Sequence, residues 1–227
     1  MNLVIIALAP VIIIALFIYI RDKYEREPFP WLLTALLAGC LITIPILFIE
    51  DWLSVPLNFI SGYSAVGWNA FIVAAFTEET FKFTALYIIF WRNEQFNEKF
   101  DGIVYACFIS LGFASVENVL YVADGGMNVG FIRAFTAVPA HALFGVMMGY
   151  HFGIARFYRT EKAKRLFLAV AVPILLHGIY DFILMSGHPY LLFFFLPYLV
   201  FLWIFGFRKI RDLSNRSIFK WISGNNR

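Results

Sequence analysis

The sequence has few charged residues and few cysteines. Only 15% of its 227 residues are charged, whereas about 25% is usual in soluble domains, and 61% are hydrophobic. The mean hydropathy is +0.77. The two cysteines, Cys40 and Cys107, both lie in apolar segments, so we expect no structural disulfide. This composition excludes a soluble globular protein and predicts an integral membrane protein.

Several catalytic motifs of membrane-embedded proteases are also missing. The sequence contains no H-E-x-x-H motif, which excludes the usual helix of a zinc protease, and no G-x-S-G serine turn. Asp181 is the only aspartate clearly inside a predicted span, so an aspartyl pair is excluded as well. The polar residues that remain inside apolar segments are mainly glutamates and two histidines.

Seven apolar segments are long enough to cross a bilayer at 1.5 Å per helical residue. They cover residues 3–20, 31–49, 69–91, 102–122, 131–155, 166–185 and 190–207. In the first segment the basic residues follow the apolar run instead of preceding it, so we expect a retained span and not a cleaved signal peptide. The sequence therefore predicts an all-α polytopic transmembrane bundle, formed as a single domain over residues 1–227.

Two connections have distinctive sequences. Residues 51–68 are apolar but interrupted by Pro56, Gly62 and Gly67, which predicts an interfacial or re-entrant outer loop that serves as a lid or substrate guide. Residues 123–130, ADGGMNVG, predict a tight turn.

The basic residues are distributed unevenly between the connections. Those after the first, third and fifth segments, together with the C-terminal tail, hold 16 of the 18 lysines and arginines. The connections on the other side hold none, and the remaining two residues, Lys82 and Arg133, lie within segments. By the positive-inside rule the N-terminus is outside and the C-terminus is cytoplasmic, in a multi-pass protein of the cell membrane. The odd number of spans and the lack of an evident repeat disfavour a transporter.

The third segment carries Glu78, Glu79 and Lys82 near its middle, where ionisable groups are costly and mark function. On a helix, Lys82 is three or four residues from each carboxylate and can reach either. One acid is then left without a partner. Two crowded carboxylates do not both ionise easily, which suits a general acid or base. The structural alternative is an ion pair that locks helix packing.

Other polar residues are expected at a similar depth in other spans. Measured along each segment, the glutamates of the third span, His141 and His177 lie about ten residues or fewer from the outer boundary, roughly 15 Å. Glu117 and Asp181 lie about five residues from the same surface. Unrelated packing groups would scatter in depth, so we expect four helices to converge on one site.

Each of these residues also has a purely structural interpretation. Asp181 follows His177 by one helical turn and can fix its imidazole tautomer, or the pair can simply satisfy itself. His141 begins a ridge of small residues, Gly145, Gly149 and Gly153, that permits close helix packing. Asn118 can orient a carboxylate or bridge two helices.

Four motifs, in this order, resemble the PrsW family of bacterial membrane proteases. They are EETFK at 78–82, FASVE at 113–117, HALFG at 141–145 and HGIYD at 177–181. RDKYEREP after the first span and DGIVYACFISLGFASVENVLY are also similar to the family pattern, and the resemblance extends over essentially the whole chain. It implies relatedness to the CAAX-processing and bacteriocin-processing proteases. It also implies cleavage of a single-span anti-sigma factor on its extracytoplasmic side, which begins release of a stress-response sigma factor.

We predict the following roles for these residues. Glu78 is the general base and Glu79 a supporting group or ligand, although either could activate water, and Lys82 balances their charge. His141 and His177 stabilise the oxyanion or bind a metal, and Glu117, Asn118 and Asp181 support them.

Two indications about a bound metal ion point in opposite directions. The resemblance implies a metallopeptidase, while related proteases support water activated by glutamate without metal. Zinc held by His141, His177 and Glu117 is the candidate, and the ammonium of Lys82 argues against a neighbouring dication.

The expected partners are the lipid bilayer and a single-span membrane substrate, with no nucleic acid. Because a transmembrane helix hides its peptide bonds, we expect the cut in a juxtamembrane stretch outside the membrane, with Arg133 holding a peptide carbonyl or carboxylate. Two other functions use the same residues: a proton- or ion-coupled transporter and a non-catalytic scaffold.

Overall fold

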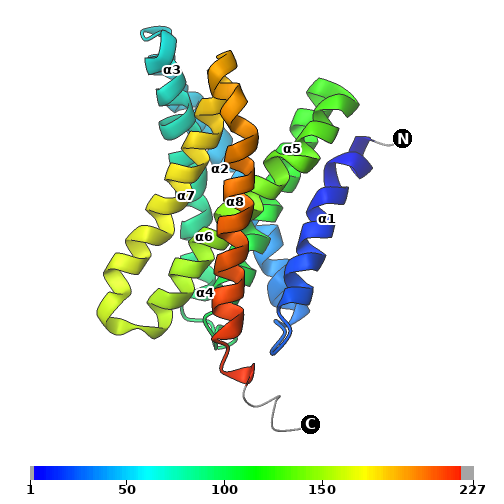
Figure 1. The fold of residues 1–227 in the computed structure, drawn as a ribbon, viewed down its shortest axis with the longest axis vertical. Coiled ribbons are helices and arrows are strands. Elements are labelled where there is room, and N and C mark those ends of the chain that lie inside the picture. Colours follow the sequence, from blue (N-terminus) through cyan, green and yellow to red (C-terminus); the bar gives the residue numbers. More distant parts are fainter. Residues whose placement is uncertain (1–2, 221–227) are drawn as a thin grey trace.

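The computed structural model describes residues 3–220, and within that range the chain is helical with no strand (Figure 1). The elements are α1 (Leu3–Arg21), α2 (Phe29–Ser54), η1 (Val55–Asn58), α3 (Gly62–Trp68), η2 (Asn69–Phe76), α4 (Thr77–Phe90), α5 (Asp101–Phe135), α6 (Ala137–Phe157), η3 (Arg159–Glu161), α7 (Lys162–Met185) and α8 (Pro189–Asn215). The all-α prediction is confirmed.

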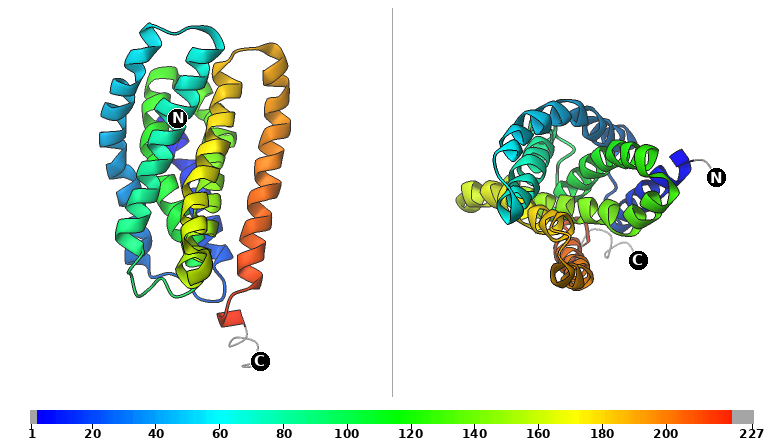
Figure 2. Two further views of the ribbon diagram at one scale, coloured as in Figure 1. Left: turned by 90° about the vertical axis from the view of Figure 1, so that its left-hand side faces the viewer. Right: turned by 90° about the horizontal axis from the view of Figure 1, so that it is seen from above.

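The long helices run up and down the longest axis of the molecule (Figures 1 and 2). The connections at residues 22–28, 91–100 and 158–161 lie at one end, together with the C-terminal side of α8. The connections at 59–61 and 186–188 lie at the other end, together with the start of α1. Helix α6 occupies the middle of the bundle, and its residues 137–155 are all buried.

The outer helices expose large apolar side chains. On α1, Ile13 is 65% exposed, on α2 Phe48 is 75% exposed, and on α8 Phe193 is 74% exposed. Soluble proteins rarely expose such continuous apolar surfaces, whereas lipid covers them in a membrane protein. These surfaces are therefore suited to the hydrocarbon of a bilayer.

Five helical stretches of the described chain are long and apolar enough to cross a membrane. They are Leu3–Arg21, Phe29–Asn58, Asp101–Phe157, Arg159–Met185 and Pro189–Asn215. Asp101–Phe157 contains both α5 and α6. The segment formed by η2 and α4 is not among the five, and it carries Glu78, Glu79 and Lys82. The structure thus supports a multi-pass membrane protein, but the number of seven spans stays a prediction.

The connection at 51–68 is mostly helical, so the expected loop conformation is wrong, while its outer position stays a prediction. Helix α2 continues to Ser54, η1 follows it, and α3 begins at Gly62, so only residues 59–61 are non-helical. Proline is accommodated there as the second residue of η1. Glycine at position 62 has a φ of 62°, which lets the chain turn before α3 begins.

The expected turn at 123–130 is far shorter than predicted. Helical residues surround a single non-helical glycine, Gly126, with a φ of 74° and a ψ of −164°. Because Arg133 contacts Glu117, sixteen residues earlier, the chain folds back at this glycine. The reversal places the last part of α5 beside its own preceding turns.

The glycine ridge of α6 forms a close helix contact, as the sequence predicts. A Cβ atom at Gly149 would lie 2.1 Å from the carbonyl oxygen of Gly102 in α5. Small residues at both positions allow the two backbones to approach at this distance. The contact holds α6, and with it His141, against α5.

An acidic cluster lies at the end of the bundle that carries the 22–28 connection. Asp22 accepts a hydrogen bond from the backbone N–H of Glu27, and the Tyr105 hydroxyl donates to the Glu27 carboxylate. Burial raises the pKa of Asp22 to about 8 and that of Glu27 to about 7. This conformation explains much of the RDKYEREP motif without a role in the site described below.

Candidate functional site

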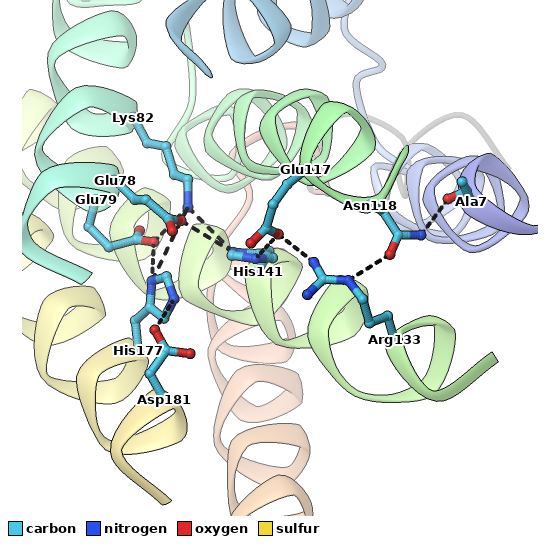
Figure 3. Close-up of polar contacts among 10 residues, drawn as sticks. All are labelled: Ala7, Glu78, Glu79, Lys82, Glu117, Asn118, Arg133, His141, His177 and Asp181. Atoms are coloured by element: carbon cyan, nitrogen blue, oxygen red, sulfur yellow. Dashed lines mark hydrogen bonds and ion pairs between the residues drawn. The ribbon is translucent and has the colours of Figure 1, made fainter. Parts of the chain in front are cut away.

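The ammonium of Lys82 lies at the centre of the polar residues (Figure 3). Its Nζ donates to Glu78 Oε2 at 2.9 Å and to Glu79 Oε1 at 2.8 Å, and Nζ lies 3.4 Å from His141 Nδ1. It also lies 4.1 Å from the ring centroid of Phe113. Lys82 therefore binds both carboxylates, and the expectation that one acid stays without a partner is wrong.

The helix that carries these residues is irregular just before them. Residues 69–76 form the π-helix η2, and α4 begins at Thr77 with regular α spacing. The spacing of α4 brings Glu78 and Glu79 onto Lys82, one turn later. Such π segments often occur at functional sites because they rotate the residues that follow.

Helix α6 supplies His141, which is held between two charged groups. Its Nε2 lies 3.0 Å from Glu117 Oε2. Because an ammonium only donates, the Nδ1 of His141 is the acceptor toward Lys82, and its Nε2–H donates to Glu117. The carboxylate of α5 thus selects one tautomer of the imidazole.

Helix α7 supplies His177, which lies between two carboxylates. Its Nδ1 is 3.0 Å from Glu79 Oε1, and its Nε2 is 3.2 Å from Asp181 Oδ2. The Phe144 ring stacks on it at 4.9 Å between centroids. The rings of His141 and His177 are 5.2 Å apart and almost perpendicular. As the sequence predicts, residues from four helical segments converge in one place.

A second branch of contacts connects the site to α1. Arg133 donates to Glu117 Oε2 at 2.5 Å and to Asn118 Oδ1 at 2.8 Å, and Asn118 donates to the carbonyl of Ala7 at 2.8 Å. The guanidinium lies 3.9 Å from the ring centroid of Tyr121. Arg133 was expected at the outer mouth as a holder of substrate, but here it is the counter-ion of Glu117.

A cavity of about 690 Å³ opens beside this network. Glu78, His141 and His177 line it, as do Glu117 and Asp181. Glu79 and Lys82 do not line it and are both 0% exposed. Of the two adjacent glutamates, Glu78 is therefore the one that a substrate or water in the cavity can reach.

Two lining carboxylates, those of Glu50 and Asp124, are not among the predicted site residues. Glu50 directly follows the second predicted span, and Asp124 lies in the predicted turn. Helix α2 reaches Ser54, so Glu50 is inside the helix, and Asp124 precedes the reversal at Gly126. An acidic residue at the end of an apolar run only weakly indicates a functional site, because acidic residues also occur at ordinary membrane boundaries.

The donor set fits a metal ion. Glu78, Glu79, His141 and His177 each offer a ligand atom, and these atoms lie within 4.8 Å of one another. Glu117 is not in this group and contacts Nε2 of His141 instead, so the expected set of His141, His177 and Glu117 stays a prediction. Each histidine has a carboxylate on its other nitrogen, as in many zinc sites, and the buried Glu79 Oε2 has no hydrogen-bond partner. The ammonium of Lys82 competes for the same carboxylates.

Comparison with known proteins identifies relatives over nearly the whole chain. The family model described as "PrsW family intramembrane metalloprotease" matches residues 27–206. Protease PrsW of Oceanobacillus iheyensis is 37% identical over 93% of this chain and 95% of its own length. Protease PrsW of Bacillus subtilis is 38% identical over 90% and 92%, and that of Clostridioides difficile is 34% identical over 96% and 93%. No solved structure matches the chain.

Proposed function

Because this chain belongs to the PrsW family of intramembrane metalloproteases and is a multi-pass, membrane-bound protease, we propose that it hydrolyses a peptide bond of a single-span membrane protein in the cavity lined by Glu78, His141 and His177. The observation that carries this proposal is that one carboxylate and two oriented imidazoles meet at one cavity wall. The transporter and scaffold alternatives have no comparable support.

Glu78 is the general base in this proposal. It accepts a proton from a water molecule as the water oxygen adds to the carbonyl carbon of the substrate. The proton then passes to the amide nitrogen, the C–N bond breaks, and a carboxylate and an amine are released. Support comes from the position of Glu78 on the cavity wall, with Glu79 behind it. Lys82 donates a hydrogen bond to each of the two glutamates and holds them in place.

His141 and His177 stabilise the charge that develops on the carbonyl oxygen, or they bind a metal ion. Glu117 and Asp181 position them through hydrogen bonds to Nε2 of each ring. Asn118 and Arg133 position Glu117 in turn. Each of these hydrogen bonds supports the proposed role of the residue that makes it.

A metal ion, for which zinc is the candidate, would draw its ligands from Glu79, His141 and His177, and Glu78 would then stay free as the base. When bound, it would polarise the substrate carbonyl and acidify water. Lys82 donates hydrogen bonds to the carboxylates of both Glu78 and Glu79. The ammonium of Lys82 and a dication would therefore compete for the same carboxylate oxygen atoms.

For the topology, we propose seven spans with the N-terminus outside and the C-terminus in the cytoplasm. The connections at 59–61 and 186–188 and the reversal at Gly126 hold no lysine or arginine, whereas each connection at the opposite end contains lysine or arginine. The substrate in this proposal is an anti-sigma factor, cut in a juxtamembrane stretch on its extracytoplasmic side. The cut begins regulated proteolysis.

The experiment is incubation of the purified protein in lipid with a single-span anti-sigma factor, followed by mass spectrometry of the new termini. We expect one extracytoplasmic cut with the wild type and none with Glu78→Gln. Cleavage at the wild-type rate by both Glu78→Gln and Glu79→Gln would contradict the assignment. A cut in the cytoplasmic half of the substrate would contradict the topology.

A further inference from the structure

The charges that line the cavity do not balance. Five carboxylates line it, and the only lining lysine or arginine in the described chain is Arg133. Those carboxylates belong to Glu50, Glu78, Glu117, Asp124 and Asp181. The cavity wall therefore has an excess of acidic groups.

Three of the five carboxylates have a partner. Lys82 pairs with Glu78 at 2.9 Å and Arg133 pairs with Glu117 at 2.5 Å. The imidazole of His177 lies 3.2 Å from the Asp181 carboxylate. These three groups are used by the site itself and are not free to receive a charge from a substrate.

Glu50 and Asp124 have no such partner. Within residues 3–220, neither carboxylate takes part in an ion pair or a side-chain hydrogen bond. They come from different elements, Glu50 from the last part of α2 and Asp124 from α5 just before Gly126. Neither belongs to a cluster of three or more candidate metal ligands in that part of the chain. A bound ion is therefore a weaker explanation than a cation carried by a substrate.

The two carboxylates differ in their surroundings. Glu50 is partly buried, so salt would screen its contact with a cation only weakly, whereas Asp124 is exposed and can receive a cation at the edge of the cavity. A lysine or arginine side chain that enters the cavity would meet two unpaired carboxylates, whereas an acidic side chain would meet only repulsion from them.

We propose that Glu50 and Asp124 are specificity-determining residues that select a substrate with a lysine or arginine close to the scissile bond. The inference rests on the proposed protease function and adds the chemical class of the recognised residue. The two carboxylates bind the cationic side chain, while Glu78 and the two histidines act on the adjacent peptide bond. The substrate is thereby positioned by charge as well as by its apolar span.

The test uses three single-span substrates that differ only at one juxtamembrane position near the mapped cut, with lysine, glutamine or glutamate there. With the wild-type protein in lipid, we expect kcat/KM for the lysine substrate to exceed that for the glutamate substrate by about tenfold or more. The double variant Glu50→Gln/Asp124→Asn should reduce this ratio to about threefold or less. Glu50→Lys should favour the glutamate substrate.

The matched control is Asp51→Asn, which removes the exposed neighbour of Glu50 that does not line the cavity. We expect this variant to keep the wild-type ratio. Equal cleavage of all three substrates by the wild type would overturn the inference and leave the protease function intact. Absence of cleavage for all three would overturn both. Because the first comparison uses the wild-type protein alone, the result does not depend on folding of the variants.

Discussion

The Nζ atom of Lys82 lies 2.8 Å from Oε1 of Glu79, and both side chains are completely buried. Burial of either charge alone would be very costly, and the pair is more tolerable because Glu78 and His177 add further hydrogen bonds to it. This buried ion pair does not line the cavity and holds the site in place, whereas Glu78 faces the cavity. The two neighbouring glutamates thus differ in function although the same lysine binds both.

The first prediction separates these two glutamates. Glu78→Gln should lower kcat by at least about 100-fold because it removes the base, and it should cost less unfolding free energy than Glu79→Gln because Glu78 borders the cavity. Glu79→Gln should destabilise the protein by about 1–3 kcal/mol, because Glu79 accepts from both Lys82 and His177 in a buried position. Activity assays and thermal unfolding in detergent measure the two effects. Equal loss of stability in both variants would contradict the division of roles.

The second prediction concerns metal. Lys82→Met removes the ammonium that competes for Glu78 and Glu79, so zinc should bind at least about tenfold more tightly, as measured by isothermal titration calorimetry. Without zinc, the variant should be less stable by about 3–5 kcal/mol, because buried carboxylates lose their partner. The control is Lys164→Met on the exposed start of α7. Unchanged zinc affinity in Lys82→Met would contradict the competition.

The third prediction concerns the branch through Arg133. Arg133→Gln removes the counter-ion of Glu117 and the hydrogen bond to Asn118, so the orientation of His141 is weakened. We expect kcat to fall by about 10- to 100-fold, in the range found for residues that position metal or catalytic ligands. Arg133→Lys should recover little, because lysine lacks the planar fork that reaches two acceptors. Full activity in both variants would show that Glu117 needs no arginine, and Arg159→Gln on η3 serves as the control.

The fourth prediction is a pH dependence of stability from the acidic cluster. Burial raises the pKa of Asp22 to about 8 and that of Glu27 to about 7, above the values of about 4 expected in the unfolded chain. Between pH about 4 and about 8, these two carboxyl groups therefore hold more protons in the folded state than in the unfolded state. The free energy of unfolding should decrease as the pH rises through this range. In Asp22→Asn, the drop in melting temperature across this pH range should be smaller than in the wild type by at least about 3 °C. The control is Asp51→Asn. Identical pH profiles for Asp22→Asn and wild type would refute it.

The fifth prediction tests the contact between α5 and α6. Gly149→Ala places a Cβ atom 2.1 Å from the Gly102 carbonyl oxygen, so the helices must separate, at a cost of about 1–3 kcal/mol. Activity should fall as well, because His141 is on the same helix. Gly67→Ala in α3 is the matched control, since the nearest atom lies 3.9 Å from the added Cβ, and it should change stability by less than about 0.5 kcal/mol. If the two variants melt at the same temperature, the close contact between α5 and α6 does not contribute to stability.

By itself, the sequence determined the helical membrane architecture and the residue types of the site. Apolar length identifies helices such as α1 and α8, since a bilayer requires long uninterrupted runs. Within one helix, spacing also predicts contacts, as for Glu78 with Lys82 and His177 with Asp181, because residues four apart lie on the same face.

Only the tertiary structure decided which groups from different helices meet. The pairing of Arg133 with Glu117 depends on the reversal at Gly126, and one residue in a positive-φ conformation leaves little trace in a hydropathy pattern. The position of Glu79 behind Glu78 depends on how α4 is rotated after the π-helix, and hydropathy does not report that rotation. Glu50 faces the cavity because α2 continues past the expected end of its span. These features arise from packing between elements distant in sequence, so no local pattern of residues specifies them.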